Sequence, residues 1–178
     1  MNIKEHIGKE NSKKNWEQVV DYIGDDPQRF HELMQIFLHG ERQMVQRSSQ
    51  PVGKIGEIHP RLIKPYFADL IGYLESDPID AVKRNITRIF QFIPLEEAHE
   101  GRLFDIALSY LASEKEPIAV KAFSMTVLRR ICEKYPELSD EVIHQIEILV
   151  EEKQSPGIVG RGRFELEKLR TIKSLCDS

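Results

Sequence analysis

Apolar residues recur at every third or fourth position along most of the chain, which is the spacing of one face of an amphipathic helix. Between residues 61 and 76, Ile63, Phe67, Leu70 and Leu74 form one such stripe. Three further segments have the same kind of pattern: residues 29–39, 101–113 and 141–153. The alternation of apolar and polar residues that is typical of half-buried strands does not compete with it. The sequence therefore predicts an all-α protein.

A second set of helical segments repeats with a period of about 38 residues. These segments are residues 40–60, 76–94, 115–136 and 154–172. Val45, Val82, Val120 and Val159 occupy equivalent places in them, at spacings of 37, 38 and 39 residues. A period of this length is typical of stacked structural repeats. Each repeat is predicted to be a pair of helices, a first (A) helix and a second (B) helix.

Prolines mark the ends of the predicted helices. Three of them follow a polar or acidic residue at the start of a B helix: Asp77-Pro78, Glu116-Pro117 and Ser155-Pro156. Backbone N–H groups in the first helical turn have no acceptor within the helix, so a proline there costs no hydrogen bond. Three others lie just beyond a B helix, which they cannot continue: Pro60, Pro94 and Pro136. The proline positions therefore support the helix pairs that the apolar pattern predicts.

The N-terminal region precedes the first repeat. Trp16, Val19, Val20 and Ile23 predict an extra helix that would cover the first repeat as a terminal cap. Residues 1–12 are rich in charged side chains and are predicted to be loose. A length of 178 residues suits one domain, so residues 1–178 are predicted to form a single repeat domain.

The segments "PIDAVK" and "PIAVK" place a proline ahead of a Val-Lys pair at the start of a helix. This pattern resembles HEAT-like repeats over residues 27–175, although Gly160 replaces the lysine in the last repeat. "IAVKAFSMTVLRRI" and "RGRFELEKL" are similar to small bacterial HEAT-like proteins that are sometimes labelled adenylosuccinate lyase. The resemblance implies a right-handed α-α superhelix of about four helix pairs with an N-terminal capping helix.

The stretch "RSSQPVGKIG" raises the question of a lyase. Its serines, proline and lysine resemble the catalytic loop of the fumarase and argininosuccinate/adenylosuccinate lyase superfamily, which reads approximately "GSSxMPxKxN". Here Arg47 replaces the leading glycine, Gly56 replaces the asparagine, and no methionine precedes Pro51. The repeat register places the stretch inside the first B helix. We therefore predict an interrupted B helix, and a protein that is not an enzyme.

Composition argues against several other classes. The chain is 40% hydrophobic and 30% charged, and no apolar run approaches the roughly 20 residues of a membrane-spanning helix. Two isolated cysteines, Cys132 and Cys176, indicate neither a disulfide framework nor a zinc site and favour a reduced, cytoplasmic protein. "HELMQ" lacks the second histidine of the zinc motif H-E-x-x-H. No catalytic residue, metal ligand or cofactor is predicted.

Charge separates the two kinds of helix. The B segments 41–57, 78–93, 117–134 and 156–175 contain 15 Lys or Arg and 6 Asp or Glu, whereas the rest of the chain contains 10 and 23. The B helices line the concave side of HEAT-like arrays, so the resemblance implies a basic groove on an acidic body. Four residues at near-repeat spacing are predicted to form a row along it: Arg47, Arg84, Lys121 and Arg161. Four others are predicted to broaden it: Arg88, Arg129, Arg130 and Arg163.

Two interpretations of this basic row stay open. It could bind phosphates, carboxylates or an acidic peptide, because arginine offers bidentate hydrogen bonds to such groups. It could instead be a structural ladder that bridges to acidic residues of the adjoining turn or repeat, for which Asp77, Glu114 and Glu116 are available.

The sequence predicts a non-catalytic interaction scaffold that binds an acidic protein or peptide segment on a basic B-helix face. The alternative is nucleic-acid binding or DNA base repair, as in HEAT-like alkylpurine DNA glycosylases, which need an aromatic-lined pocket and a catalytic carboxylate. The net charge of −4 and a single tryptophan, Trp16 in the cap, disfavour it. Four phenylalanines are predicted to pack in the core: Phe90, Phe92, Phe123 and Phe164.

Overall fold

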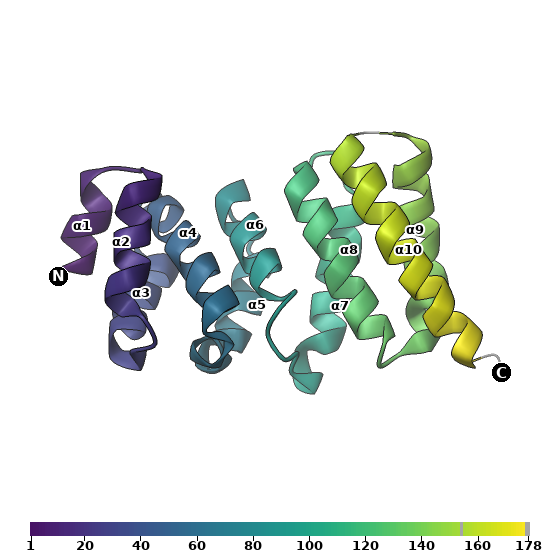
Figure 1. Cartoon of the computed structure of the whole chain (residues 1–178), viewed down its shortest axis with the longest axis horizontal. Coiled ribbons are helices and arrows are strands. Elements are labelled where there is room, and N and C mark those ends of the chain that lie inside the picture. The colour runs from purple at the N-terminus through teal and green to yellow at the C-terminus, as the bar shows by residue number, and fades with distance from the viewer. Residues whose placement is uncertain (154, 177–178) are drawn as a thin grey trace. The chain divides into compact units, whose positions relative to one another are not determined.

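The computed structural model describes residues 1–153 and 155–176. All regular secondary structure in these residues is helical, which confirms the predicted all-α fold. The chain divides into two compact units, Met1–Leu95 and Glu96–Ser178 (Figure 1). The single domain and the right-handed superhelical path predicted for the whole chain stay predictions.

The first unit contains two N-terminal helices and two helix pairs. Its elements are α1 (Ile3–Lys9), α2 (Lys13–Ile23), α3 (Pro27–His39), α4 (Arg42–Ile58), η1 (Pro60–Leu62), η2 (Lys64–Tyr66), α5 (Phe67–Glu75) and α6 (Asp80–Ile89). The long helix α4 lies at the centre, where it packs against α2, α3 and α6. Its apolar face, including Val52 and Ile55, is fully buried. The pairs α3–α4 and α5–α6 are the first two predicted repeats.

The N-terminus is helical, and the prediction that residues 1–12 are loose is wrong. Ile3 and Ile7 lie one helical turn apart in α1, and both are buried. The Asn2 side chain caps the helix by accepting a hydrogen bond from the Glu5 N–H at 3.1 Å. Because charged residues surround Ile3 and Ile7 in the sequence, the prediction did not recognise these two residues as the apolar face of a short helix. Both α1 and α2 pack against α4 and so cover the first helix pair.

The A helix of the second repeat begins later than the apolar stripe predicts. Residues 60–66 form two 3₁₀ turns, η1 and η2, and the α-helix starts only at Phe67. Pro65 lies within the second of these turns. Because proline lacks an N–H, it fits such a turn but weakens an α-helix that extends through it. Ile63 and Leu62 are nevertheless buried, so the stripe identified the packing face correctly.

The stretch "RSSQPVGKIG" lies entirely within α4, which confirms that it belongs to a helix, but α4 runs continuously from Arg42 to Ile58 with Pro51 inside it, so the predicted interruption is not seen. Ser48 and Ser49 are buried, and their hydroxyls donate to the carbonyl oxygens of Val45 and Gln46 at 3.0 and 2.7 Å. A Cβ on Gly53 would approach the side-chain oxygen of Asn85 on α6 to 2.7 Å. These small residues therefore allow α4 and α6 to pack closely. Buried hydroxyls bonded to their own helix do not resemble a mobile catalytic loop.

The second unit contains two helix pairs in two layers. Its elements are α7 (Glu97–Ala112), α8 (Ile118–Cys132), η3 (Pro136–Leu138), α9 (Ser139–Glu151) and α10 (Pro156–Cys176). The A helices α7 and α9 pack against each other, and so do the B helices α8 and α10. In Figure 1, α8 and α10 lie nearer the viewer than α7 and α9. We call α8 and α10 the B layer of this unit and α7 and α9 its A layer.

The register of the last repeat differs by one residue from the prediction. Val45, Val82 and Val120 are buried at equivalent positions, but in α10 the buried residue is Ile158 and Val159 is half-buried. The Ser155 hydroxyl accepts a hydrogen bond from the Ile158 N–H at 3.1 Å, so the predicted polar residue before Pro156 does cap the helix. Within residues 1–153 and 155–176, no helix is both long and apolar enough to cross a lipid bilayer.

Candidate functional site on the B layer of the second unit

The predicted basic row does not have one role. Arg47, on α4, donates through one guanidinium nitrogen to the Ile7 and Gly8 carbonyl oxygens at 3.2 and 2.6 Å. These are carbonyl groups of the last turn of α1, where basic side chains are favourable. Arg47 therefore fixes α1 to α4, and the prediction that it faces a groove is wrong.

The first unit also contains Arg84 and Arg88, both half-buried on α6. Arg88 forms an ion pair with Glu57 on α4. Burial acts to raise the pKa of Glu57, but Arg88 and Lys54 outweigh it and hold this pKa below its ordinary value. Arg84 has no ion-pair partner among the residues that the structure describes.

Lys121 is buried, so the prediction that it faces a ligand is also wrong. Its true counterpart in the second repeat is Lys83, which follows Val82 as Lys121 follows Val120. Lys83 is buried as well, and its ammonium group lies 2.5 Å from a carboxylate oxygen of Asp77. A buried lysine needs such a partner because the loss of hydration is costly. At this repeat position the structural-ladder interpretation therefore applies.

Arg129 and Arg161 converge on one buried carboxylate, that of Glu165. Arg129 Nε lies 2.8 Å from Glu165 Oε2, and Arg161 lies 3.4 Å from Oε1. The Thr126 hydroxyl donates to Oε1 at 2.6 Å and accepts from Arg161 at 3.0 Å. Arg129 also pairs with Glu133, one turn further along α8. This network joins α8 to α10 and holds two guanidinium groups in defined orientations.

Glu165 was missed at the sequence level, although the sequence contains a signal. In α10 the residues Ile158, Gly162, Glu165 and Leu169 follow one another at spacings of four, three and four. This is the spacing of a buried stripe, and a glutamate within it is a buried carboxylate that needs cationic partners. Arg161, one turn earlier, supplies one of them.

A hollow of about 430 Å³ opens beside this network. Six residues line it, one just beyond the end of α8 and five from α10: Glu133, Phe164, Glu167, Lys168, Thr171 and Ile172. We call it the B groove. The Phe164 side chain is 50% exposed, and the Lys168 ammonium lies 4.2 Å from the centre of its ring. Arg163, the next residue before Phe164, is exposed and has no ion-pair partner among the described residues.

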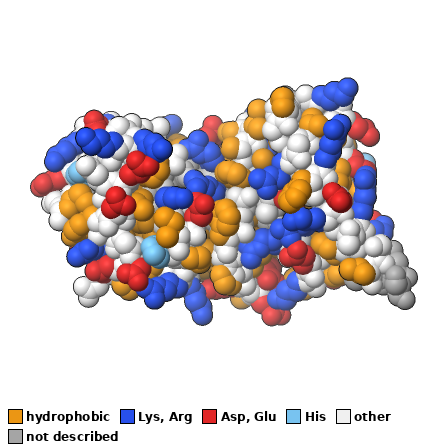
Figure 2. Space-filling view, in the orientation of Figure 1, with side chains coloured by type: hydrophobic (Ala, Val, Ile, Leu, Met, Phe, Trp, Pro, Cys, Tyr) orange, Lys and Arg blue, Asp and Glu red, His pale blue; other side chains and the backbone are white. Residues whose placement is uncertain are grey.

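The two layers of the second unit differ in charge. Helix α8 contains three Lys or Arg and no Asp or Glu, and α10 contains five and two. Helices α7 and α9 together contain seven Asp or Glu and one Arg. Figure 2 shows Lys and Arg side chains gathered over α8 and its boundary with α10. The charge difference counted along the sequence therefore lies between the A layer and the B layer of this unit, whereas the basic groove along the whole chain stays a prediction.

A family model described as HEAT repeat domain matches residues 3–163. The chain belongs to this HEAT repeat family. A search of curated proteins found no match, and neither did a search of solved structures. HEAT repeats usually serve as scaffolds for protein interactions. The match gives no support to the adenylosuccinate lyase label.

The phenylalanines of this HEAT repeat protein were predicted to pack in the core, and the structure divides them. Phe90 is buried against Phe67, with ring centres 5.0 Å apart. Phe123 is half-buried, whereas Phe92 and Phe164 are 47% and 50% exposed. Helical spacing alone does not identify which side of a terminal helix is left uncovered. The exposure of Phe164 is the feature that distinguishes the B groove from a purely charged surface.

Within the described part of the HEAT repeat chain, no group of three or more His, Cys, Asp or Glu is arranged to hold a metal ion. His31, from "HELMQ", instead has its Nδ1 atom 2.8 Å from the Tyr66 hydroxyl oxygen. Cys132 is a free, buried thiol. Burial raises the pKa of this thiol to about 11. A buried and protonated thiol is not suited to nucleophilic chemistry.

Proposed function

We propose that this HEAT repeat protein is a non-catalytic scaffold that binds an acidic segment of a partner protein through the B groove. The observation that supports this most directly is the exposed Phe164 ring, which has the Lys168 ammonium 4.2 Å from its centre. An exposed aromatic ring can hold an apolar side chain of the partner, while Arg163 and Lys168 attract neighbouring carboxylates.

The network of Glu165 makes this surface ordered. Arg161 is held by the buried Glu165 carboxylate, so its guanidinium group needs little further ordering when a ligand arrives, whereas Arg129 is engaged by both Glu165 and Glu133. Arg161 is 36% exposed, which leaves part of its guanidinium open to a second anion. A partner that carries one apolar residue among acidic ones matches this arrangement better than a uniformly acidic one.

The B groove supports protein binding better than DNA repair. A base-repair enzyme of the alkylpurine glycosylase kind would need an available carboxylate in an aromatic-lined pocket. Both oxygens of Glu165 are already engaged by Thr126, Arg129 and Arg161. This arrangement supports a structural role for Glu165.

The test is fluorescence anisotropy with a labelled acidic peptide that has one central leucine. We expect Phe164→Ala and Lys168→Glu each to weaken binding at least about tenfold, which corresponds to about 1.4 kcal/mol. Lys115→Glu is the matched control, because Lys115 is exposed in the loop between α7 and α8 and outside the groove. It makes the same charge change and should alter the affinity less than about twofold.

Two results would contradict the proposal. One is equal weakening by Lys115→Glu and Lys168→Glu, which would show that only net charge matters. The other is binding of duplex DNA that is tighter than peptide binding and falls steeply with salt, because this result would favour the nucleic-acid alternative.

A further inference from the structure

A second cavity of the second unit lies on its A layer and is unrelated to the B groove. It has a volume of about 530 Å³. Nine residues line it: Glu97, Glu100, Gly101, Phe104, Asp105, Ile131, Tyr135, Leu138 and Glu141. Five of them lie on one face of α7, and the others come from the end of α8, from η3 and its preceding turn, and from the start of α9. We call this cavity the acidic pocket.

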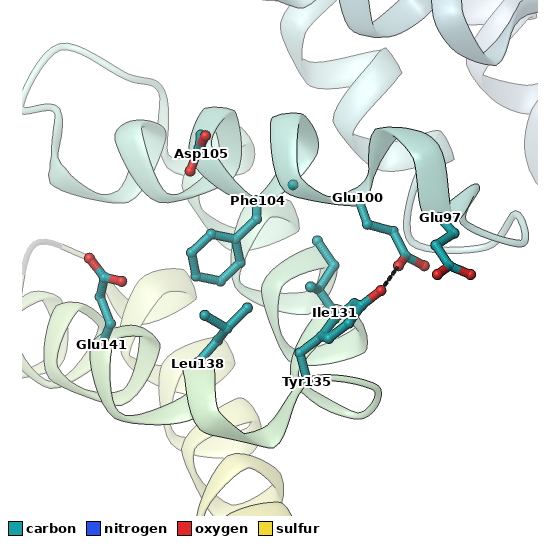
Figure 3. A pocket seen from close by; sticks show the side chains of 9 residues that line it. Glu97, Glu100, Phe104, Asp105, Ile131, Tyr135, Leu138 and Glu141 are labelled. Atoms are coloured by element: carbon teal, nitrogen blue, oxygen red, sulfur yellow. Dashed lines mark hydrogen bonds between the residues drawn. The ribbon is translucent and has the colours of Figure 1, made fainter.

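The floor of the acidic pocket is apolar. Phe104 and Ile131 are almost fully buried beneath it, and Leu138 is half-buried. Figure 3 shows Phe104 and Leu138 facing each other in the middle of the pocket, with Glu141 on one side and Glu100 and Tyr135 on the other. A Cβ on Gly101 would meet no atom within 4 Å, so open space lies over this part of α7.

The rim of the pocket carries four carboxylates but only part of their charge is neutralised. The Tyr135 hydroxyl and the Lys134 ammonium donate to Glu100 at 2.9 and 3.0 Å. The hydrogen bond to Glu100 raises the pKa of Lys134, so this lysine stays charged. It also lies 3.4 Å from a carboxylate oxygen of Glu97.

The two remaining carboxylates are available to a ligand. Asp105 and Glu141 are exposed, and neither has an ion-pair partner among the residues that the structure describes. They lie on different helices, α7 and α9, and the apolar floor extends from them toward Glu100. A ligand that fits must therefore combine positive charge with an apolar group that covers Phe104 and Leu138.

We propose that the acidic pocket binds a basic segment of a partner protein, in which an apolar side chain flanked by Lys or Arg lies against Phe104 and Leu138. The flanking cations pair with Asp105 and Glu141, and the aliphatic part of an arginine covers the exposed edge of the floor. The second unit then has two docking surfaces of opposite charge preference, one on each layer. This assignment does not depend on the function of the B groove.

Isothermal titration calorimetry tests the assignment with a short peptide that has two arginines on each side of one leucine. Gly101→Leu fills the open space over α7 without changing the charge of the protein, and we expect it to weaken binding at least about tenfold. Gly101→Ala is its matched control and should change the affinity less than about twofold. Both changes raise helix propensity at an exposed position, so both variants should fold, which circular dichroism verifies.

A second pair of variants tests the charges. Glu141→Gln should weaken peptide binding several-fold, whereas Glu151→Gln, an exposed carboxylate on the same helix outside the pocket, should not. Replacing the leucine of the peptide with serine should weaken binding to the wild-type protein and not to Gly101→Leu.

Three results would overturn the proposal. The first result is that the peptide does not bind the wild-type protein. The second is that Gly101→Leu binds the peptide as tightly as Gly101→Ala does. The third result is that sedimentation shows a dimer of the protein and that Gly101→Leu abolishes this dimer, which would assign the pocket to a second copy of this chain. None of these results affects binding of an acidic peptide to the B groove, so the two proposals fail separately.

Discussion

Glu165 determines how the cations of the B layer are arranged. Its side chain is 1% exposed, and such a group is stable as an anion only where cations and hydrogen-bond donors surround it. Arg129, Arg161 and Thr126 meet this requirement from two helices. Two partly exposed arginines therefore share one buried negative charge, and Arg129 also pairs with the exposed Glu133.

Replacing Glu165 with glutamine keeps the shape of the side chain but removes its charge. We expect Glu165→Gln to lower the free energy of unfolding by about 2–3 kcal/mol, because two arginines then lose their common partner. Urea denaturation followed by circular dichroism measures this loss. Glu167→Gln, at an exposed position of the same helix, should cost less than about 0.5 kcal/mol. Equal effects of the two changes would contradict the role given to Glu165.

Cys132 provides a test of burial in the B layer. Burial raises the pKa of its thiol to about 11, because the charged thiolate would lose its hydration. In a Cys176→Ser variant at pH 8, alkylation of native protein should be at least about a hundredfold slower than alkylation in urea. Because the folded-state pKa is raised, this group's contribution to stability is full below pH 9 and is lost as the pH rises toward about 11. Rapid alkylation of the native protein would show that α8 is not packed as described.

At the scale of helices, most of the fold could be predicted from the sequence. Apolar spacing located all four helix pairs, and the prolines located their ends, because both features act within a few residues. The prediction failed where tertiary contact decided the outcome. Ile3 and Ile7 form too short a stripe to indicate a helix by itself, but α2, α3 and α4 complete its packing.

The candidate site was less predictable than the fold. The repeat spacing identified Arg129 and Arg161 as members of one basic set, and they do converge. It could not distinguish them from Lys121, because only the packing of α8 shows which face of the helix each residue occupies. The exposure of Phe164 depends likewise on the absence of a covering element, which local spacing does not encode.

Close packing between α9 and α10 depends on one glycine. A Cβ at Gly162 would lie 2.5 Å from Val150 Cγ2 and 3.2 Å from Ile146 Cγ2. Gly162→Ala should therefore destabilise the protein by about 1–3 kcal/mol, because the helices must separate or the side chains must shift. Gly160→Ala, on the same helix with nothing within 4 Å of the new Cβ, should be neutral or stabilise by up to about 1 kcal/mol. Thermal denaturation of the two variants provides the comparison, and a stable Gly162→Ala would disprove the close approach.

At the scale of the molecule, the second unit has two chemically different layers. Its B layer combines cations with the exposed ring of Phe164, and its A layer combines carboxylates with the apolar floor at Phe104. The two proposed binding surfaces therefore lie on different layers of this unit. In the first unit, Arg47 and Arg88 join helices, as Arg129 and Arg161 do in the second.

A titration of ¹⁵N-labelled protein with the acidic, leucine-containing peptide, followed by ¹H–¹⁵N correlation spectra, tests binding at the B groove. We expect the largest shift changes on the groove residues Glu133, Phe164, Lys168, Thr171 and Ile172. We also expect Phe164→Ala to abolish saturation at the same peptide concentrations. Shift changes confined to other helices, or unchanged saturation in Phe164→Ala, would show that the peptide does not bind in the B groove.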